Sequence, residues 1–209
     1  SAGSGKYTLT DMPTWTVDPI DGTTNFVHHL SLSCVIIAYL CNKEVCVGVV
    51  YDPMADELFS ATKGGGAFLE RGTRTSQQIR VSDTKAIPQA VISMDPGYGR
   101  DAASVDRFTA CQANLLKKGL RNVRTVGSTG LNMAWTACGR LDAGFEQGSW
   151  ETGGPKIWDF SAGKLLVEEA GGVTRDVGLA TQLSPDSGLD LMGRSFLAAA
   201  TSELAAELM

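Results

Sequence analysis

The secondary-structure rhythm of the sequence changes near residue 85, and this change constrains the fold more than any other feature. Between residues 33 and 70, four short apolar segments are separated by turn-forming residues, which predicts an antiparallel meander. After residue 85, strand-like segments alternate with segments of helical periodicity, which predicts helices packed on a mixed sheet. We therefore expect a layered α+β or α/β sandwich, with an antiparallel β part at residues 1–85 and an α/β domain at residues 86–209.

The expected elements follow from apolar spacing and from turn residues. In the first part we expect strands at 34–40, 45–51, 57–61 and 67–70. The turn Lys63-Gly64-Gly65-Gly66 lacks the Gly-Lys-Ser/Thr ending of a P-loop, so it predicts a hairpin turn. In the second part we expect strands at 90–94, 123–126, 141–146, 172–177 and 196–200. Helices are expected at 104–118 and 129–138, from Asp159 onward, and after a cap at Thr201 or Ser202, while 95–99 is expected to be a loop.

Composition excludes several function classes. The 209 residues carry a net charge of −5, which provides no basic footprint for nucleic acid. The longest apolar runs reach only about half the length of a membrane span, and no basic-then-apolar leader precedes them. The five cysteines include no C-x-x-C pair, and an odd number cannot all pair within the chain. We therefore expect a protein with reduced thiols in the cytoplasm that binds neither nucleic acid nor a membrane.

A turn rich in oxygen donors follows the apolar residues Trp15–Val17. It reads Asp18-Pro19-Ile20-Asp21-Gly22-Thr23-Thr24. Proline fixes its own φ near about −65° and favours extended geometry in the residue before it, so we expect the strand to end here. On a bent backbone, both carboxylates and the Ile20 carbonyl could face one Mg²⁺ ion. Two carboxylates about 4 Å apart repel by roughly 4 kcal/mol at an effective dielectric near 20, and a divalent cation offsets this repulsion.

The residues after these carboxylates are suited to an anion. Gly22 lets the main chain approach a ligand closely, and Thr23 and Thr24 offer hydroxyls and N-cap geometry that would direct amide N–H groups toward phosphate. A structural alternative stays open on composition alone. In that alternative, both aspartates only cap backbone amides of a turn between two strands.

The order of these residues resembles a known family. Asp18-Pro-Ile-Asp-Gly-Thr-Thr-Asn-Phe-Val-His28 is similar over eleven residues to the first signature of the inositol monophosphatase family, whose members are Mg²⁺-dependent, lithium-sensitive phosphomonoesterases. Trp158-Asp159-x-x-Ala-Gly163, about 140 residues later, resembles the second signature. Val126-Gly127-Ser128-Thr129 resembles a glycine-containing turn that lines the substrate's alcohol in that family, and Glu146 matches a glutamate that binds inositol hydroxyls.

The resemblance implies a reaction and a site. Water attacks a phosphate monoester, most simply inositol monophosphate, with two or three Mg²⁺ ions as the cofactor. The implied metal ligands are Asp18, which bridges two ions, the Ile20 carbonyl, Asp21 and Asp159. The implied catalytic residues are Asp18, Asp21, Asp159 and Thr23, whose hydroxyl orients the water. The implied substrate-binding residues are Ile20, Asp21, Gly22, Thr23, Gly127, Ser128, Thr129, Glu146 and Asp159. The family also implies a small phosphorylated polyol as substrate and a homodimer.

The sequence departs from the family pattern in three places. The resemblance implies helices and a Gly-Glu-Glu metal segment before the first signature, so we expect this chain to be the remainder of a longer protein. Residues 147–158 form a longer segment than in the animal inositol enzymes, and we expect it to border the alcohol pocket. Ser128 and Thr129 are bulkier or more polar than the small residues expected there.

These departures leave alternatives open. Histidinol phosphate, fructose bisphosphate, 3′-phosphoadenosine phosphates and dinucleotide phosphates are rival substrates within the family. The segment Thr24–His28 resembles the inositol branch more than the nucleotide branch. Outside catalysis, the chain could be a catalytically dead phosphate-binding relative or a purely structural α/β module.

Overall fold

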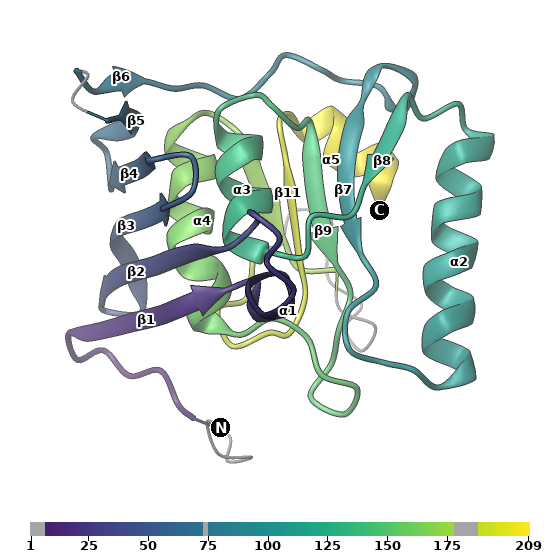
Figure 1. Cartoon of the computed structure of the whole chain (residues 1–209), viewed down its shortest axis with the longest axis horizontal. Coiled ribbons are helices and arrows are strands. Elements are labelled where there is room, and N and C mark those ends of the chain that lie inside the picture. Colours follow the sequence, from purple (N-terminus) through teal and green to yellow (C-terminus); the bar gives the residue numbers. More distant parts are fainter. Residues whose placement is uncertain (1–6, 73–74, 178–187) are drawn as a thin grey trace.

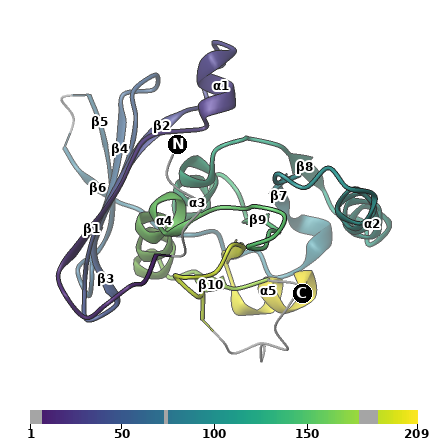
Figure 2. The same ribbon diagram turned by 90° about the horizontal axis from the view of Figure 1, so that it is seen from below.

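The fold is a stack of sheets and helices. A computed structural model describes residues 7–72, 75–177 and 188–209 of the chain. Helices α3 (Thr129–Ala137) and α4 (Ile157–Glu169) lie between a six-stranded and a five-stranded sheet (Figure 1). Helices α2 (Ala102–Lys117) and α5 (Ser202–Leu208) lie on the far side of the second sheet (Figure 2). The predicted α+β layered sandwich is confirmed.

The first sheet is antiparallel throughout, in the order β1-β2-β3-β4-β5-β6. Its four central strands confirm the predicted meander to within one or two residues. The triple-glycine segment forms the predicted hairpin turn, and the Glu169 carboxylate accepts hydrogen bonds from Gly64 N at 2.6 Å and Gly66 N at 2.8 Å. The strands are β1 (Thr14–Asp21), β2 (Cys34–Cys41), β3 (Glu44–Asp52), β4 (Glu57–Thr62), β5 (Gly66–Arg71) and β6 (Gln77–Gln78).

The second sheet is mixed, as predicted, in the order β10-β11-β9-β7-β8. Strand β7 runs parallel to both β8 and β9, whereas the two pairs made by β11 are antiparallel. The carboxyl ends of β7 and β9 therefore meet at one edge of the sheet. The strands are β7 (Val91–Asp95), β8 (Asn122–Arg124), β9 (Ala143–Glu146), β10 (Val173–Arg175) and β11 (Phe196–Ala199), and a short 3-10 helix, η1 (Ile87–Gln89), precedes β7.

The two central helices are apolar almost all round because both faces are covered. Most residues of α3 and α4 are buried, and the larger core cluster combines them with side chains of the first sheet. A boundary near residue 85 stays a prediction, since this core takes residues from both sides of it. A second cluster joins α2 and α5 to the other sheet. Among the described residues, no helix combines the length and the apolarity needed to cross a bilayer.

Small residues bring α4 close to the first sheet. A Cβ atom on Gly48 of β3 would lie 2.9 Å from Cα of Ala162, so only glycine permits this contact. At the preceding residue of the helix, the buried hydroxyls of Ser161 and Thr16 are 2.9 Å apart and share a hydrogen bond. These contacts place the first turn of α4 beside β1.

Strand β1 does not end at Pro19, so that prediction is wrong. The strand continues to Asp21, and its register with β2 shifts between Asp18 and Asp21. Strand β1 lies at the edge of its sheet, and an edge position or a bulge tolerates the missing proline N–H. The irregularity brings Asp18 and Asp21 to the end of the strand, above the helices.

Candidate metal and phosphate site

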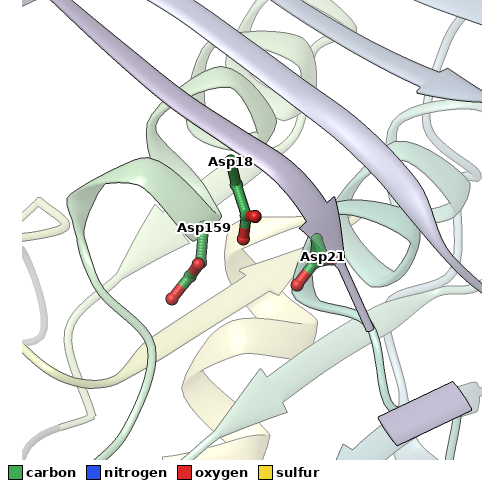
Figure 3. A group of neighbouring side chains, drawn as sticks. All are labelled: Asp18, Asp21 and Asp159. Carbon is green, nitrogen blue, oxygen red and sulfur yellow. The ribbon is translucent and has the colours of Figure 1, made fainter. Parts of the chain in front are cut away.

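Three aspartates from distant parts of the chain converge at the end of β1. Asp18 and Asp21 belong to this strand, and Asp159 belongs to the first turn of α4 (Figure 3). Each offers a carboxylate oxygen, and these three atoms lie within 4.8 Å of one another. Asp21 is buried, while Asp18 and Asp159 are half-buried. The structure thus brings together the three acids that the two signatures contain.

Asp159 is oriented by the start of its helix. Helix α4 begins at Ile157, so the prediction that Asp159 starts the helix is wrong by two residues. Lys156 is the N-cap residue, and its backbone N–H donates to Asp159 Oδ2 at 2.6 Å. The carboxylate reaches back to the helix start as the third residue of a capping box does. This bond engages one oxygen and leaves Oδ1 for the cluster.

Asp21 is held by the start of helix α3. Its Oδ2 atom accepts hydrogen bonds from the Ser128 hydroxyl at 2.5 Å and from Gly130 N at 2.8 Å, and the Cys34 thiol lies 3.6 Å away. Three donors therefore face the same oxygen. The Oδ1 atom of Asp21 is left for a ligand.

The electrostatics of the cluster favour a cation. Burial, followed by the neighbouring Asp18 and Asp21 carboxylates, raises the pKa of Asp159 to about 8. Burial also raises the pKa of Asp21, against the opposing effect of its hydrogen bond from Ser128. Carboxylates this close repel one another by about 4 kcal/mol per pair at an effective dielectric near 20. The all-oxygen donor set fits a hard divalent cation such as Mg²⁺, which would offset that repulsion.

The helix after Asp18 is not capped by Thr23 or Thr24, contrary to the prediction from the sequence. The N-cap of helix α1 (Thr23–Val27) is Gly22, with φ of 78°, and neither threonine caps the helix. A Cβ atom on Gly22 would lie 2.6 Å from the Leu32 carbonyl oxygen, so this position requires glycine. The Thr23 hydroxyl donates instead to the Ile20 carbonyl at 3.0 Å. This bond fixes the carbonyl that the sequence nominates as a metal ligand.

A cavity of about 410 Å³ opens beside the three aspartates. All ten residues that the sequence predicts for the site line this cavity. These are Asp18, Ile20, Asp21, Gly22, Thr23, Gly127, Ser128, Thr129, Glu146 and Asp159.

Ser128 lines the cavity, and its hydroxyl is hydrogen-bonded within the protein. The side chain is 2% exposed. Its hydroxyl donates to Asp21 and accepts a hydrogen bond from Leu131 N at 3.2 Å, which caps helix α3. Both bonds are internal to the protein, so the hydroxyl supports the acid cluster.

A second pair of acids, Asp95 and Glu146, lines the same cavity. Glu146 ends β9 and pairs in register with Asp95, which ends β7. Burial, followed by the charges of Asp95 and Asp21, raises the pKa of Glu146 to about 8, and a hydrogen bond with Thr129 opposes this effect. Asp95 was not among the site residues predicted from the sequence, because residues 95–99 were expected to form a loop. The signal was present, since carboxyl ends of parallel strands gather ligand-binding side chains at one sheet edge.

The long segment at residues 147–158 contains a tight hairpin at residues 149–153 and then enters helix α4. Ser149 and Gly153 exchange two backbone hydrogen bonds of 2.9 Å. The guanidinium of Arg194 donates to the Pro155 carbonyl at 2.9 Å and to the Gly154 carbonyl, and it stacks over the Trp150 ring. Pro155 lines the cavity. The segment thus borders the cavity through Pro155, as expected.

Sequence comparisons give relatives that share a name. The chain is 46% identical over 176 residues to a tomato (Solanum lycopersicum) protein named inositol monophosphatase 2, covering 84% of this chain and 62% of the relative. It therefore spans about three fifths of the length of that relative.

Solved structures give the same family name. An inositol monophosphatase from Anabaena (Nostoc) superposes with a TM-score of 0.77 at 32% identity, covering 95% of this chain and 72% of that one. Staphylococcus aureus SaIMPase-II bound to inositol monophosphate superposes with a TM-score of 0.77 at 26% identity, covering 98% and 70%. A second structure of SaIMPase-II contains 2′-AMP.

The family assignment covers the whole sequence. The sequence profile of the inositol monophosphatase family matches residues 1–209. The two signatures, the layered fold and the three converging aspartates agree with that match. This chain belongs to the inositol monophosphatase family.

Proposed function

We propose that the protein hydrolyses a phosphate monoester in the presence of Mg²⁺, with inositol monophosphate as the preferred substrate. The observation that carries the proposal is the meeting of the Asp18, Asp21 and Asp159 carboxylate oxygens within 4.8 Å. Family membership supports the reaction class. The inositol monophosphate in the SaIMPase-II structure supports the choice of alcohol.

We assign the metal ligands as the sequence nominates them. The carboxylates of Asp18, Asp21 and Asp159, together with the Ile20 carbonyl, would hold two or three Mg²⁺ ions. Bound Mg²⁺ supplies a lowered water pKa and neutralises charge on the phosphoryl and leaving oxygens. The protein contributes the fixed orientation of these ligands, which is supported by the bonds of Asp21 to α3 and of Asp159 to the Lys156 amide.

The remaining cavity residues are assigned to the substrate. The amides of Gly22 and Thr23 hold the phosphate, and the Thr23 hydroxyl orients the attacking water. Glu146 and Thr129 are hydrogen-bonded to each other and line the cavity. We assign both side chains to hydrogen bonds with the hydroxyl groups of the substrate's alcohol. We assign the backbone of Gly127 to the same pocket. The Ser128 hydroxyl is assigned to Asp21 instead, because both of its bonds are internal.

A substrate panel tests this proposal. Full-length protein should release phosphate from inositol monophosphate only when Mg²⁺ is present, faster than from histidinol phosphate, fructose bisphosphate or 3′-phosphoadenosine phosphates. Millimolar lithium should inhibit the release, as in the resembled family. Binding of Mg²⁺ without turnover of any substrate in the panel would instead identify a catalytically dead relative.

A nucleotide substrate is the second candidate. The 2′-AMP in a SaIMPase-II structure supports it, and the cavity has an aromatic ring, Tyr98, at a position that lines it. A higher kcat/KM for 2′-AMP than for inositol monophosphate in the same panel would favour this alternative.

We also propose a cytoplasmic homodimer that binds neither nucleic acid nor a membrane. The five cysteines are free thiols in the structure, and the net charge of −5 disfavours nucleic acid. Three apolar side chains at and after α1, Phe26, Val27 and Leu30, are 55%, 65% and 54% exposed, and we assign them to the subunit interface. Light scattering of full-length protein should give twice the mass of one chain, and Phe26→Glu should halve it.

A further inference from the structure

We infer that Asp95 is a positioning residue whose buried carboxylate holds the turn at residues 126–128 and thereby orients the ligating carboxylate of Asp21. This inference rests on the proposed metal site. Asp95 lies outside both family signatures, and the reaction proposed above does not use it. Its place at the carboxyl end of β7 puts it between that turn and helix α3.

Asp95 binds both sides of the turn. Its Oδ1 atom accepts a hydrogen bond from Gly127 N at 3.0 Å, and its Oδ2 atom accepts one from the Asn132 amide at 2.6 Å. Asp95 is 7% exposed and Asn132 is fully buried. Both carboxylate oxygens therefore hold the segment that enters α3, one before the helix begins and one in its first turn.

The held turn has a conformation that needs support. Gly127 has φ of 73°, and a Cβ atom there would lie 3.0 Å from the Asn25 amide nitrogen. From the other side, the Asn25 side-chain amide donates to the Val126 carbonyl at 2.8 Å and to the Gly127 carbonyl at 3.3 Å. Asp95 accepts a hydrogen bond from the Gly127 N–H, and Asn25 donates one to the Gly127 carbonyl. The peptide groups on both sides of Gly127 are therefore fixed.

Ser128, the last residue of this turn, and Gly130 hold the Asp21 carboxylate. Ser128 follows Gly127 directly, and its hydroxyl together with Gly130 N binds Asp21 Oδ2 at 2.5 and 2.8 Å. A shift of the turn would move both donors at once. Ligands held by hydrogen-bonded neighbours lose metal affinity when those neighbours are removed, typically by about 10- to 100-fold.

The matched control is a second buried aspartate in the same sheet region. Asp142 is 9% exposed and accepts one backbone bond, from Val91 N at 2.7 Å, and one side-chain bond, from the Ser82 hydroxyl at 2.6 Å. Like Asp95, it accepts a backbone hydrogen bond on one oxygen and a side-chain hydrogen bond on the other, yet it does not line the cavity. Replacing it reports the structural cost of losing such a carboxylate.

The test compares Asp95→Ala, Asp95→Asn and Asp142→Ala in full-length protein. Titration calorimetry with Mg²⁺ alone measures cation affinity, and thermal unfolding measures stability. We expect Asp95→Ala to weaken Mg²⁺ binding at least tenfold. Asp142→Ala should lower the melting temperature by about as much as Asp95→Ala does, but should change the Mg²⁺ affinity less than twofold. Asp95→Asn should retain affinity within threefold, because the Asn132 Oδ1 atom, which has no partner in the structure, can accept from the new amide when Asn132 flips.

Two outcomes overturn the inference: unchanged Mg²⁺ affinity in Asp95→Ala, or equal loss in Asp95→Asn and Asp95→Ala. If Asp95→Ala does not fold, Asn132→Ala is measured in its place. This variant removes the donor to Asp95 Oδ2, so a threefold or greater loss of affinity supports the role and no loss overturns it. If wild-type protein binds Mg²⁺ but releases no phosphate, only the proposed function is refuted. If wild-type protein is active and Asp95→Ala binds Mg²⁺ as tightly as wild type, only this inference is refuted.

Discussion

The Ser128 hydroxyl donates a hydrogen bond of 2.5 Å to the Oδ2 atom of Asp21, 107 positions earlier in the chain. The same hydroxyl accepts from Leu131 N and caps helix α3. One side chain therefore binds Asp21, the last residue of the strand that carries two of the three acids, and also caps helix α3. The geometry of the acid cluster is coupled through this atom to the packing of the two halves.

Ser128→Ala should affect both stability and cation binding. Loss of the cap should lower the free energy of unfolding by about 1–2 kcal/mol, and loss of the bond to Asp21 should weaken Mg²⁺ binding several-fold. Thr201→Ala is the matched control, since Thr201 caps α5 by accepting from Leu204 N at 3.2 Å, far from the cavity. Chemical denaturation and calorimetry measure the two effects. Equal Mg²⁺ affinities in both variants would remove Ser128 from the support of the site.

Asp21→Asn in full-length protein should lose phosphate release by at least about 100-fold, even at raised Mg²⁺. A neutral amide is a weaker ligand than a carboxylate, and cation affinity depends on the charge and number of ligands. Asp101→Asn provides the comparison, because Asp101 caps α2 by accepting from Ser104 N at 3.0 Å and lies outside the cavity. Ordinary activity in Asp21→Asn would exclude Asp21 from the site.

Cation binding should depend on pH and should release protons. In the metal-free protein the pKa of Asp159 is raised from 3.8 to about 8, so at pH 7 the folded state holds a proton that Mg²⁺ must displace. Apparent Mg²⁺ affinity should fall by up to about tenfold per pH unit below pH 8. Calorimetry at pH 7 in buffers of different ionisation enthalpy measures the protons released. An affinity independent of pH between 6 and 8 contradicts this account.

The same pKa fixes the sign of a stability effect. The folded pKa of Asp159 lies above its unfolded value, so the folded state binds more protons between pH 4 and pH 8. The contribution of this group to stability is therefore full below about pH 4 and is lost as the pH rises toward 8. Saturating Mg²⁺ should reverse the trend. Thermal unfolding of metal-free and Mg²⁺-loaded protein between pH 5 and 8 should give melting temperatures that diverge with increasing pH.

The periodic segments of this fold were predictable from the sequence, whereas its irregular ends were not. Alternating apolar residues between clear turns identified β2 to β5, and helical spacing identified α2. Strand β1 extends past Pro19 because its partner strand lies on one side only, a fact of sheet order that the local sequence does not contain. Helix α4 begins two residues before Asp159 because the Asp159 carboxylate binds the backbone N–H of the N-cap residue Lys156, so the aspartate is the third residue of the helix.

The site was predictable where residues form a contiguous motif. Asp18 to Thr23 and Asp159 were identified because their order matches two signatures, and the structure brings them to one cavity. Asp95 was missed, since one aspartate before Pro-Gly is typical of a loop. Its importance follows from the parallel pairing of β7 with β9, which depends on the whole second sheet.

Tyr98 should influence which alcohol the cavity accepts. It lines the cavity, and a Cβ atom on Gly153 of the hairpin would lie 3.0 Å from the Tyr98 Cβ atom. Tyr98→Ala should remove the aromatic ring that supports a nucleotide base and lower the ratio of kcat/KM for 2′-AMP over inositol monophosphate at least threefold. Tyr51→Ala is the control, because Tyr51 bonds to Asp56 in the first sheet, outside the cavity. An unchanged ratio in Tyr98→Ala would separate this ring from substrate choice.

A crystal of full-length protein soaked with Mn²⁺ tests the central claim most directly. Anomalous scattering locates the ions without reference to any assumed mechanism, and Mn²⁺ takes the same oxygen ligands as Mg²⁺. We predict peaks about 2.0–2.4 Å from carboxylate oxygens of Asp18, Asp21 and Asp159. Peaks confined to other acidic side chains, with these three aspartates free of metal, would contradict the account.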